Sequence, residues 1–597
     1  MKKDTFIYII CGLLLIAAAS VIFTPAFEVG GNLFDKIDAA AACLSWPIAL
    51  HISKVTVKAF GTLFLIFLIG IAIYFSEKTH RRDGQEYGSS KWGDVKKLCK
   101  RYADKDFSKN RLLTQNLRIS ETGKRITLNL ITLVIGGSGA GKSFFYCIPN
   151  LLQAQGSYVV LDPSGELLAR TGAFLKMQGY KVRALNLDDM SSSFGYNPFA
   201  YIKTDDDVLR LVKNLFKATV PKGSHSNDPM WDNQAEALCM AYMLLIFHEG
   251  GEEEKNMRTL MYLAREDAVE EDEDGNIKET AVSALFHKVE LETPDHIAVR
   301  FYKTARKGSA KTVLGVQTTL MGRLSKFNLE SVLRLTDFDE MGFEKIGCEK
   351  TALFLVIPAE DTSFNFIVSM VYAQLIPILY RTAKSNFDLR LTVPVHFLMD
   401  EFSNVTLPDD FLTILTTARK HAISFSVIIQ AISQLKGLFE KEQFNTLIGN
   451  ADELLYLGSG EFETQKYISE RIGKETIMVK SHNLSKGIHG SYSENSQPAA
   501  RSLLEPSEVD TVLSEGKALV KLRGCDWVMD EKINPKKHPS YRHTSDVTGK
   551  AFSFSDGSRI SSTIHFEGKE AEEDVRIYAD DISADIYERI EIISEDE

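Results

Sequence analysis

The pattern of apolar and polar positions separates a short N-terminal part with long uncharged runs from a longer part with short ones. Residues 5–27 form an uncharged run of 23 positions, and residues 59–76 form a second run of 18. With a rise of about 1.5 Å per residue, each run is long enough for a helix that crosses a hydrocarbon core about 30 Å thick. We therefore predict two transmembrane helices, at about 5–27 and 56–76.

The charges beside these runs predict their orientation. Basic residues precede the first run and follow the second (Lys2, Lys3, Lys78, Arg81 and Arg82). The positive-inside rule then places both chain ends in the cytoplasm and residues 28–54 outside as a short loop. A cleaved signal peptide is the alternative, because the MKK start, the apolar run and the small residues at 17–20 fit that pattern.

Beyond residue 130, short apolar runs alternate with helix-like segments. The runs end in polar or glycine-rich sequence, as buried strands of a parallel sheet do, and they lie at 131–135, 158–162, 351–357, 393–399 and 425–429. Residues 230–249 and 411–420 have helical spacing, and the whole stretch from about 200 to 330 lacks an alternating strand pattern. The sequence predicts an α/β fold that a helical segment interrupts.

A glycine loop follows the first of these strands. Its sequence GGSGAGKS fits the phosphate-binding pattern G-x-x-x-x-G-K-[ST], with a strand before it and a helix after it. The loop amides and the helix N-terminus favour phosphate, Lys142 would reach the β- and γ-phosphates, and Ser143 would bind Mg²⁺. We predict that ATP is bound by Gly136, Gly137, Ser138, Gly139, Ala140, Gly141, Lys142, Ser143 and Phe144.

A phosphate loop of this kind needs a carboxylate on a neighbouring strand to hold the magnesium. Asp162 ends one apolar run, and the pair Asp400–Glu401 ends another. We favour the second: Asp400 is predicted to face Mg²⁺, and Glu401 to orient or deprotonate the attacking water. Because ATP is a cytoplasmic substrate, this site also favours the uncleaved, two-span anchor.

Two polar residues near the strand at 425–429 are further candidates. Gln430 ends that strand, and side chains at such strand ends point into the ligand crevice of an α/β sheet. A γ-phosphate sensor and a simple strand cap explain Gln430 equally well. Arg419 and Lys420, at the end of the preceding helix, have the composition of a solvated helix end.

Charge and cysteine content limit the other possibilities. The net charge of −11 argues against nucleic acid as a partner, but residues 569–597 hold twelve acidic and three basic residues, whereas residues 77–125 hold fourteen basic and seven acidic ones. The acidic tail therefore sets most of the overall sign. The seven cysteines form no C-x-x-C pair, which argues against a zinc ribbon or a disulfide framework.

Taken together, these motifs resemble the conjugative coupling proteins of type IV secretion systems, the TraG/TraD-like membrane ATPases. The resemblance runs from about residue 1 to 530 and includes, besides the two spans and the glycine loop, YGSSKWGD (87–94), VVLDPSGEL (159–167), YNPF (196–199), DPMWDNQAEAL (228–238), HFLMDEFSN (396–404), ARKHAISFSVIIQAISQL (418–435), IGNADELLYLGS (448–459) and RSLLEPSEV (501–509).

The resemblance implies a RecA-like P-loop NTPase domain with an inserted all-α domain, preceded by two transmembrane helices. It implies five parts: an anchor at 1–76, the nucleotide-binding domain at 77–200 and 336–545, the all-α domain at 201–335, and an acidic tail at 546–597. It also implies a homohexamer around a DNA channel. In that ring Arg419 takes the position of an arginine finger that completes a neighbour's site, and Gln430 takes the sensor position.

The function that the resemblance implies is a coupling ATPase in the cell inner or cytoplasmic membrane. It would recruit relaxase-bound single-stranded DNA, with accessory proteins, to the secretion channel and drive its transfer. A receptor for protein cargo only, a chromosome pump of the FtsK type and a membrane scaffold without activity are the alternatives. The external loop is shorter than in several envelope-spanning systems.

Three further segments carry weaker expectations. Residues 301–327 contain six basic residues that would contact DNA phosphates or form a solvated face: Lys303, Arg306, Lys307, Lys311, Arg323 and Lys326. Residues 481–502 predict a mobile loop or an irregular hairpin. The acidic tail predicts either a small partner-binding helix, with Ile582, Ile586, Ile590 and Ile593 on one face, or a disordered segment.

Overall fold

The computed structural model describes residues 3–45, 47–78, 85–121, 128–220, 229–268, 278–484, 492–514, 516–554 and 558–560. The chain forms two compact units. One contains the chain up to Ser89 together with Lys474–Arg501, and the other contains Ser90–Gly473 and the chain from Ser502. Most of the acidic stretch at 266–279 and the tail from residue 561 onward lie outside the described residues.

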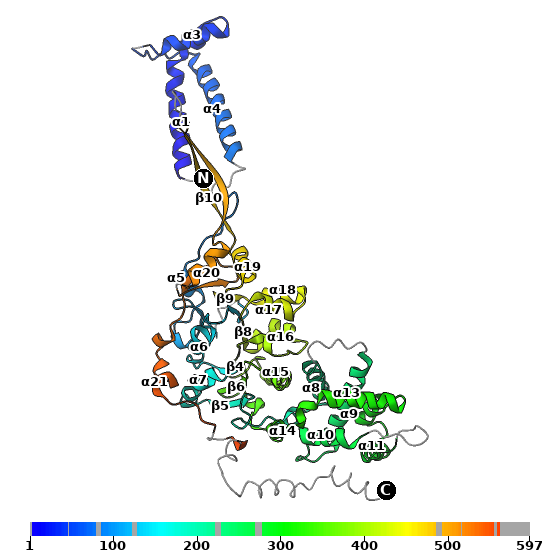
Figure 1. The fold of residues 1–597 in the computed structure, drawn as a ribbon. Helices are drawn as coiled ribbons and strands as arrows, with labels where there is room; N and C mark the ends of the chain where they lie inside the picture. The colour runs from blue at the N-terminus through cyan, green and yellow to red at the C-terminus, as the bar shows by residue number, and fades with distance from the viewer. Residues whose placement is uncertain are drawn as a thin grey trace. The chain divides into compact units, whose positions relative to one another are not determined.

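The first unit contains the two predicted membrane runs (Figure 1). Helix α1 (Lys3–Ile22) packs along α4 (Thr56–Lys78), and the segment between them forms α2 (Thr24–Glu28) and α3 (Leu33–Cys43). Gly12 permits this packing, because a Cβ there would lie 2.5 Å from the Phe67 ring. The first run is not one helix: it breaks at Phe23, and Pro25 opens the next short helix.

Two helices of the described chain are long and apolar enough to span a membrane. Thr56–Ile73 in α4 is one, and only 6% of this window is buried inside the protein. The other, α15 (Asn365–Ser385), has 78% of its positions buried and is a core helix of the second unit. For α1 the apolar part with described side chains is Cys11–Ile22. These findings support a membrane-associated chain, whereas its topology stays a prediction.

The first unit also contains two long strands. Strands β10 (Lys474–Leu484) and β11 (Tyr492–Ser502) pair as a two-stranded sheet, and Ser89 forms a bridge with Glu475 beside them. The segment predicted as a mobile loop or an irregular hairpin is therefore mostly strand. The residues that connect the two strands lie outside the described part of the chain.

The second unit is built on a sheet of nine strands. Its order is β13-β12-β9-β3-β8-β7-β4-β6-β5, and the seven strands from β9 to β5 are parallel. Strands β3, β6, β7 and β8 are buried at every position, as parallel strands covered on both faces are. The α/β prediction is confirmed. The strands are β3 (Ile131–Gly136), β4 (Ser157–Pro163), β5 (Lys181–Asn186), β6 (Thr351–Ile357), β7 (Val395–Met399), β8 (Ile423–Ile429), β9 (Glu453–Gly458), β12 (Lys517–Leu522) and β13 (Val528–Glu531).

Helices connect and cover these strands, and a small ladder of β1 (Asn110–Leu112) and β2 (Arg118–Ser120) precedes them. Besides α15, the helices are α5 (Val95–Tyr102), α6 (Ile148–Leu151), α7 (Glu166–Met177), α16 (Phe411–Thr417), α17 (Ile432–Leu438), α18 (Lys441–Asn450), α19 (Phe462–Ile472), α20 (Pro506–Ser514) and α21 (Ser545–Thr548). Helix α16 begins at Phe411 as predicted but ends at Thr417 instead of Lys420, and a 3₁₀ turn, η7 (Ala418–His421), follows before β8.

In the described part of the chain between β5 and β6, the regular elements are helices and short 3₁₀ turns joined by loops (Figure 1). A buried carboxylate joins several of these helices: Asp267 accepts hydrogen bonds from the hydroxyls of Tyr242 and Tyr302. The helices are α8 (Asp205–Ala218), α9 (Pro229–Glu249), α10 (Met257–Glu266), α11 (Ala281–Glu292), α12 (Ile297–Ala305), α13 (Ala310–Arg323) and α14 (Glu330–Thr336).

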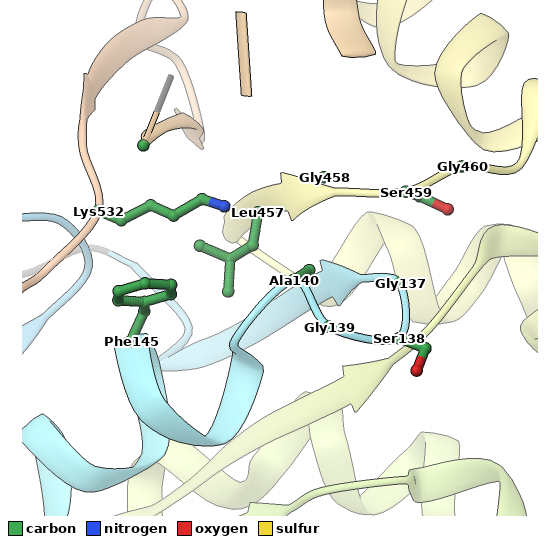
Figure 2. Close-up of a pocket in the computed structure, with 11 residues that line it drawn as sticks. Gly137, Ser138, Gly139, Ala140, Phe145, Leu457, Gly458, Ser459, Gly460 and Lys532 are labelled. Atoms are coloured by element: carbon green, nitrogen blue, oxygen red, sulfur yellow. The ribbon is translucent and has the colours of Figure 1, made fainter. Parts of the chain in front are cut away.

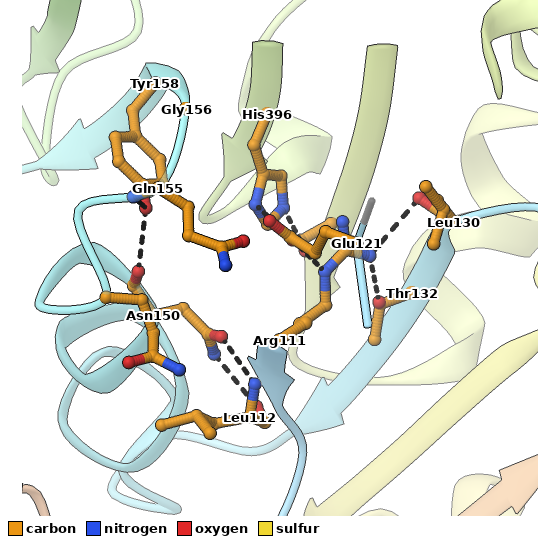
Figure 3. A network of polar contacts seen from close by, with 12 residues as sticks. Arg111, Leu112, Glu121, Leu130, Thr132, Asn150, Gln155, Gly156, Tyr158 and His396 are labelled. Carbon is orange, nitrogen blue, oxygen red and sulfur yellow. Dashed lines mark hydrogen bonds and ion pairs between the residues drawn. The ribbon is translucent and has the colours of Figure 1, made fainter. Parts of the chain in front are cut away.

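A buried polar network lies at the amino ends of the central strands (Figure 3). The fully buried guanidinium of Arg111 donates to Glu121 at 2.8 Å, to the Thr132 hydroxyl at 2.9 Å and to Glu453 at 3.2 Å. Burial lowers the pKa of Arg111, but the attraction of Glu121 and Glu453 outweighs it and raises the pKa overall. This network therefore keeps its charges paired inside the domain.

The same network extends to the helix after the glycine loop. The His396 ring contacts the Ser426 hydroxyl at 2.8 Å, and Ser426 shares a hydrogen bond of 2.7 Å with Tyr146. Asn150 binds both the backbone amide and the carbonyl of Leu112, at 2.8 and 2.9 Å (Figure 3). The helix that follows the loop is thus anchored to the sheet and to β1 by polar groups.

Candidate functional site

The glycine loop leaves the carboxyl end of β3 and turns into the next helix. Gly139 and Gly141 have φ values of +75° and +78°, which favour glycine. A Cβ on Gly141 would lie 2.4 Å from the Phe145 ring, so the close turn also excludes a side chain there. Lys142 lies within the loop, and its amine is 3.5 Å from the Gly137 carbonyl oxygen. The predicted phosphate loop has the expected shape.

The helix after the loop differs from the expectation of a regular α-helix. Ser143–Cys147 form a π-helical turn before α6. Pro149 accounts for this widening, because it has no N–H to donate to the carbonyl of Phe145. π-turns inside helices occur frequently at functional sites.

The carboxylate pair predicted at the end of β7 lies beside the loop. The Ser143 hydroxyl donates to Asp400 at 2.8 Å, and Asp400 is only 3% exposed. Burial raises the pKa of Asp400, while the hydrogen bond from Ser143 and the charge of Lys142 oppose that rise. These two oxygen ligands suit Mg²⁺. Within the described residues no three His, Cys, Asp or Glu side chains enclose a metal site, so phosphate and water would supply its other ligands.

Glu401 lies next to this pair and is held by two amides. Its Oε1 accepts from Gln430 at 3.0 Å and its Oε2 accepts from Asn404 at 2.9 Å. Its backbone has φ = +51°, a strained conformation for a residue with a side chain. The structure thus brings Glu401 and Gln430 into contact and adds Asn404, which lies only three residues away and was not among the predicted site residues.

The sheet order corrects one expectation. We expected the magnesium carboxylate on a strand that neighbours β3, but β8, which ends in Gln430, lies between β3 and β7. The alternative carboxylate, Asp162, has another role. Its carboxylate accepts hydrogen bonds from the backbone amides of Leu167 and Leu168 at 3.0 and 2.7 Å, and so caps the start of α7. Burial raises the pKa of Asp162 to about 7.

Arg419 lies at the opposite edge of the sheet. It precedes the amino end of β8 and donates to the Leu128 carbonyl at 3.0 Å, whereas the glycine loop follows the carboxyl end of β3. The two strands are parallel, and their length of six to seven residues separates the edges by about 20 Å. Arg419 is exposed there and does not lie in the site of its own chain.

A cavity of about 440 Å³ opens on the other side of the glycine loop (Figure 2). Loop residues 137–140 and Phe145 form one wall, residues 457–460 after β9 form the second, and Gly516 and Lys532 close it. Phe144, which the sequence analysis assigned to ATP binding, does not line this cavity, whereas its neighbour Phe145 does. Lys532 lies far along the chain, and no local motif indicated it.

Half of the six basic residues predicted between 301 and 327 already have acidic partners. Arg306 pairs with the buried Asp267 at 2.5 Å, and Arg323 pairs with Asp232 at 2.7 Å. Lys303 pairs with Glu290. The two arginines are mostly buried and stabilise the helical insert, so they do not form a free surface for DNA phosphates. Three exposed lysines remain: Lys307, Lys311 and Lys326.

The comparison with protein families agrees with this geometry. A family model described as "Type IV secretory system Conjugative DNA transfer" matches residues 92–532, which is well over half of the chain. The chain belongs to this family. The family therefore confirms the resemblance to conjugative coupling proteins that the motifs indicated.

Relatives from this family share about a quarter of the aligned residues. Protein VirD4 of Rhizobium radiobacter is 23% identical over 418 residues, covering 67% of this chain and 57% of the relative. The type IV secretion system-coupling protein VirD4 of Bartonella quintana is 24% identical, covering 69% and 62%. The conjugal transfer protein TraG of Rhizobium radiobacter is 22% identical, covering 68% and 60%. The chain thus spans about three fifths of the relatives it matches.

Solved structures of a coupling protein share the fold. The conjugative coupling protein TrwBdeltaN70 has a TM-score of 0.52 at 17% identity, covering 76% of this chain and 95% of that one. TrwB in complex with the ATP analogue ADPNP has a TM-score of 0.53 at 17% identity, covering 75% and 94%. These matches confirm the RecA-like domain with its all-α insertion. A further TrwB structure contains ADP and Mg²⁺.

Proposed function

We propose that this protein is an ATP-hydrolysing coupling protein that recruits relaxase-bound DNA to a type IV secretion channel and drives its transfer. One observation carries the proposal: Ser143, Asp400, Glu401 and Gln430 meet beside an intact phosphate loop, within the family of conjugative DNA transfer proteins. Membership in that family favours DNA transfer over a pump of the FtsK type.

In the proposed reaction each residue of the site has one task. The loop amides and Lys142 bind the phosphates of ATP, and Ser143 and Asp400 hold Mg²⁺. The magnesium ion would offset negative charge on the phosphates when it is bound. Glu401 orients the attacking water and accepts its proton, and Gln430 and Asn404 hold the Glu401 carboxylate in place for that step.

The position of Arg419 supports a site shared between subunits. An arginine at the amino edge of the sheet is too far from its own phosphate loop to act there, but in a ring it would face the loop of the next subunit. We therefore include a homohexamer in the proposal, with Arg419 as the finger of the neighbouring site. The predicted domain boundaries and the cytoplasmic orientation of the motor belong to the same proposal.

The test is ATP hydrolysis by the full-length protein in detergent, with and without single-stranded DNA. We expect DNA to accelerate hydrolysis, and Lys142→Ala to abolish it. DNA cross-linking to the protein during mating separates the two kinds of cargo: DNA adducts are expected, and continued protein export without any adduct would favour a receptor for protein cargo only. Hydrolysis that survives Lys142→Ala would contradict the site.

A mixing experiment tests the shared site. Arg419→Ala and Lys142→Ala are each expected to be inactive, with Lys420→Ala as the matched control that keeps activity. Mixed in one preparation, the two inactive variants should regain part of the activity, because some interfaces then combine an intact Lys142 with an intact Arg419. A mixture as inactive as its components would show that Arg419 does not act across subunits.

A further inference from the structure

The cavity beside the glycine loop lies on the side away from the catalytic groups. In the sheet β3 has β8 on one side and β9 on the other. Asp400, Glu401 and Gln430 lie at the ends of β7 and β8, whereas the cavity lies between the glycine loop and the end of β9 (Figure 2). None of the roles proposed above uses this space.

The direction of a bound nucleotide follows from that arrangement. Its terminal phosphate must point toward Glu401, because the attacking water is activated there. The loop amides hold the phosphate chain, so the ribose and base leave the loop on the other side, toward β9. The cavity has about 440 Å³, which is within the range of small-molecule sites.

The walls of the cavity are firmly held. The Gly137 amide donates to the Gly458 carbonyl at 2.7 Å, which ties the glycine loop to the second wall. Gly458 has φ = +117°, a conformation reserved for glycine, and Ser459 after it is 6% exposed. The cavity is therefore a built feature of the domain and keeps its shape through backbone contacts.

Two side chains give the cavity its chemical character. The ring of Phe145 is half-buried and offers a flat apolar surface. The amine of Lys532 lies 5.4 Å from the centre of that ring, and burial lowers the pKa of Lys532 (Figure 2). Its backbone amide donates to Gly516 at 2.8 Å, which fixes the residue at the end of β13. A flat ring and a donor suit a heterocyclic base and the acceptor atoms of a nucleoside.

We propose that Lys532 and Phe145 bind the ribose and base of the nucleotide, in the cavity between the glycine loop and residues 457–460. Lys532 then contributes to the affinity for the nucleoside part and not for the phosphates. This inference rests on the proposed ATPase function, because it assigns a binding site to the ribose and base of the same ATP molecule.

The experiment measures dissociation constants for Mg-ADP and for Mg-tripolyphosphate, which lacks ribose and base, with the full-length protein in detergent. Lys532→Met keeps the length of the side chain and removes its charge. We expect it to weaken ADP binding by about tenfold, as for one lost hydrogen bond to a charged group, and to leave tripolyphosphate binding unchanged. Lys532→Arg should recover most of the ADP affinity, and the exposed Lys536→Met should match the wild type.

The outcomes separate this inference from the function it rests on. Equal weakening for both probes would mean that Lys532 acts on the phosphates, and unchanged ADP binding would mean that it does not contact the nucleotide; either result overturns the inference and leaves the ATPase proposal standing. A wild-type protein that binds neither probe would overturn both. A melting temperature equal to that of the wild type excludes loss of the fold as the cause.

Discussion

Each of the two polar clusters of the RecA-like domain contains a glutamate, but the two glutamates have opposite environments. At the carboxyl edge of the sheet, Glu401 is half-buried and is held only by the neutral amides of Gln430 and Asn404. At the amino edge, Glu453 is fully buried and is paired with Arg111 and with the Thr132 hydroxyl. Among the described residues the first carboxylate forms no ion pair, whereas the second is paired with a guanidinium.

This difference separates catalysis from stability. A carboxylate that is held in place by neutral donors and reached by solvent can orient a water molecule and take a proton from it. A carboxylate that is buried against a guanidinium has its charge already matched, and removing one partner leaves the other charge buried and unpaired. An Asp or Glu at a strand end can be either a catalytic or a stabilising carboxylate. Its environment in the fold, and not its residue type, decides which of the two it is.

Breaking the amino-edge network should give the largest effect on stability. Arg111→Met leaves Glu121 and Glu453 without their shared cation, and we expect it to cost about 3 kcal/mol or more in the free energy of unfolding. Urea denaturation of the full-length protein in detergent measures the change. Turnover per folded molecule should fall far less than stability does.

An exposed pair is the matched control for that prediction. Arg300 pairs with Asp295 at 3.8 Å, and the two side chains are 61% and 88% exposed, so Arg300→Met should cost less than about 1 kcal/mol. Similar losses in the two variants would show that burial does not distinguish the networks.

The pH dependence of stability sharpens the comparison. Burial lowers the pKa of His396 well below 6.5, so the unfolded chain binds a proton below that pH that the folded chain does not. Acid therefore favours unfolding. The free energy of unfolding falls by about 1.4 kcal/mol for each pH unit below about 6.5. His396→Gln removes this dependence.

The measurement is the stability difference between the wild type and His396→Gln at several pH values. We expect the advantage of the wild type to be constant above pH 7 and to shrink as the pH falls from about 6.5 to 5. A difference that stays constant over this range would mean that His396 takes up its proton at the same pH in the folded and unfolded chains.

Loosening the carboxyl-edge cluster should give the smallest effect. Asn404→Ala removes one of the two amide donors to Glu401 and leaves the one from Gln430. We expect kcat to fall by about tenfold, as for one lost hydrogen bond to a charged group, with KM for ATP unchanged. Asn404→Asp would place a second negative charge beside Glu401 and should lower kcat further. An unchanged kcat in both variants would remove Asn404 from the catalytic arrangement.

The sequence predicted the parts of this molecule that depend on local pattern. The strands β3, β7 and β8 are apolar runs, and their ends identify Lys142, Asp400 and Gln430 without any knowledge of the fold. Asn404 lies within the same motif and could have been proposed as a helper of Glu401. The break of the first apolar helix at Phe23 could have been inferred from Pro25.

Contacts between distant segments could not be predicted in the same way. Lys532 reaches the glycine loop only because β12 and β13 add to the sheet beside β9. Arg111 has no signal of burial in its basic surroundings, since its partner Glu453 comes from another strand far along the chain. Arg306 and Arg323 seemed to belong to a basic surface because their acidic partners, Asp267 and Asp232, lie outside the segment.

The most direct test of the central claim compares binding and hydrolysis in a single variant. Glu401→Gln keeps the size of the side chain and one of its two acceptor oxygens, but it cannot accept a proton from water. We expect the variant to bind Mg-ATP with the affinity of the wild type and to hydrolyse it about 10³-fold more slowly. Hydrolysis at the wild-type rate would contradict the assignment of Glu401 and with it the proposed active site.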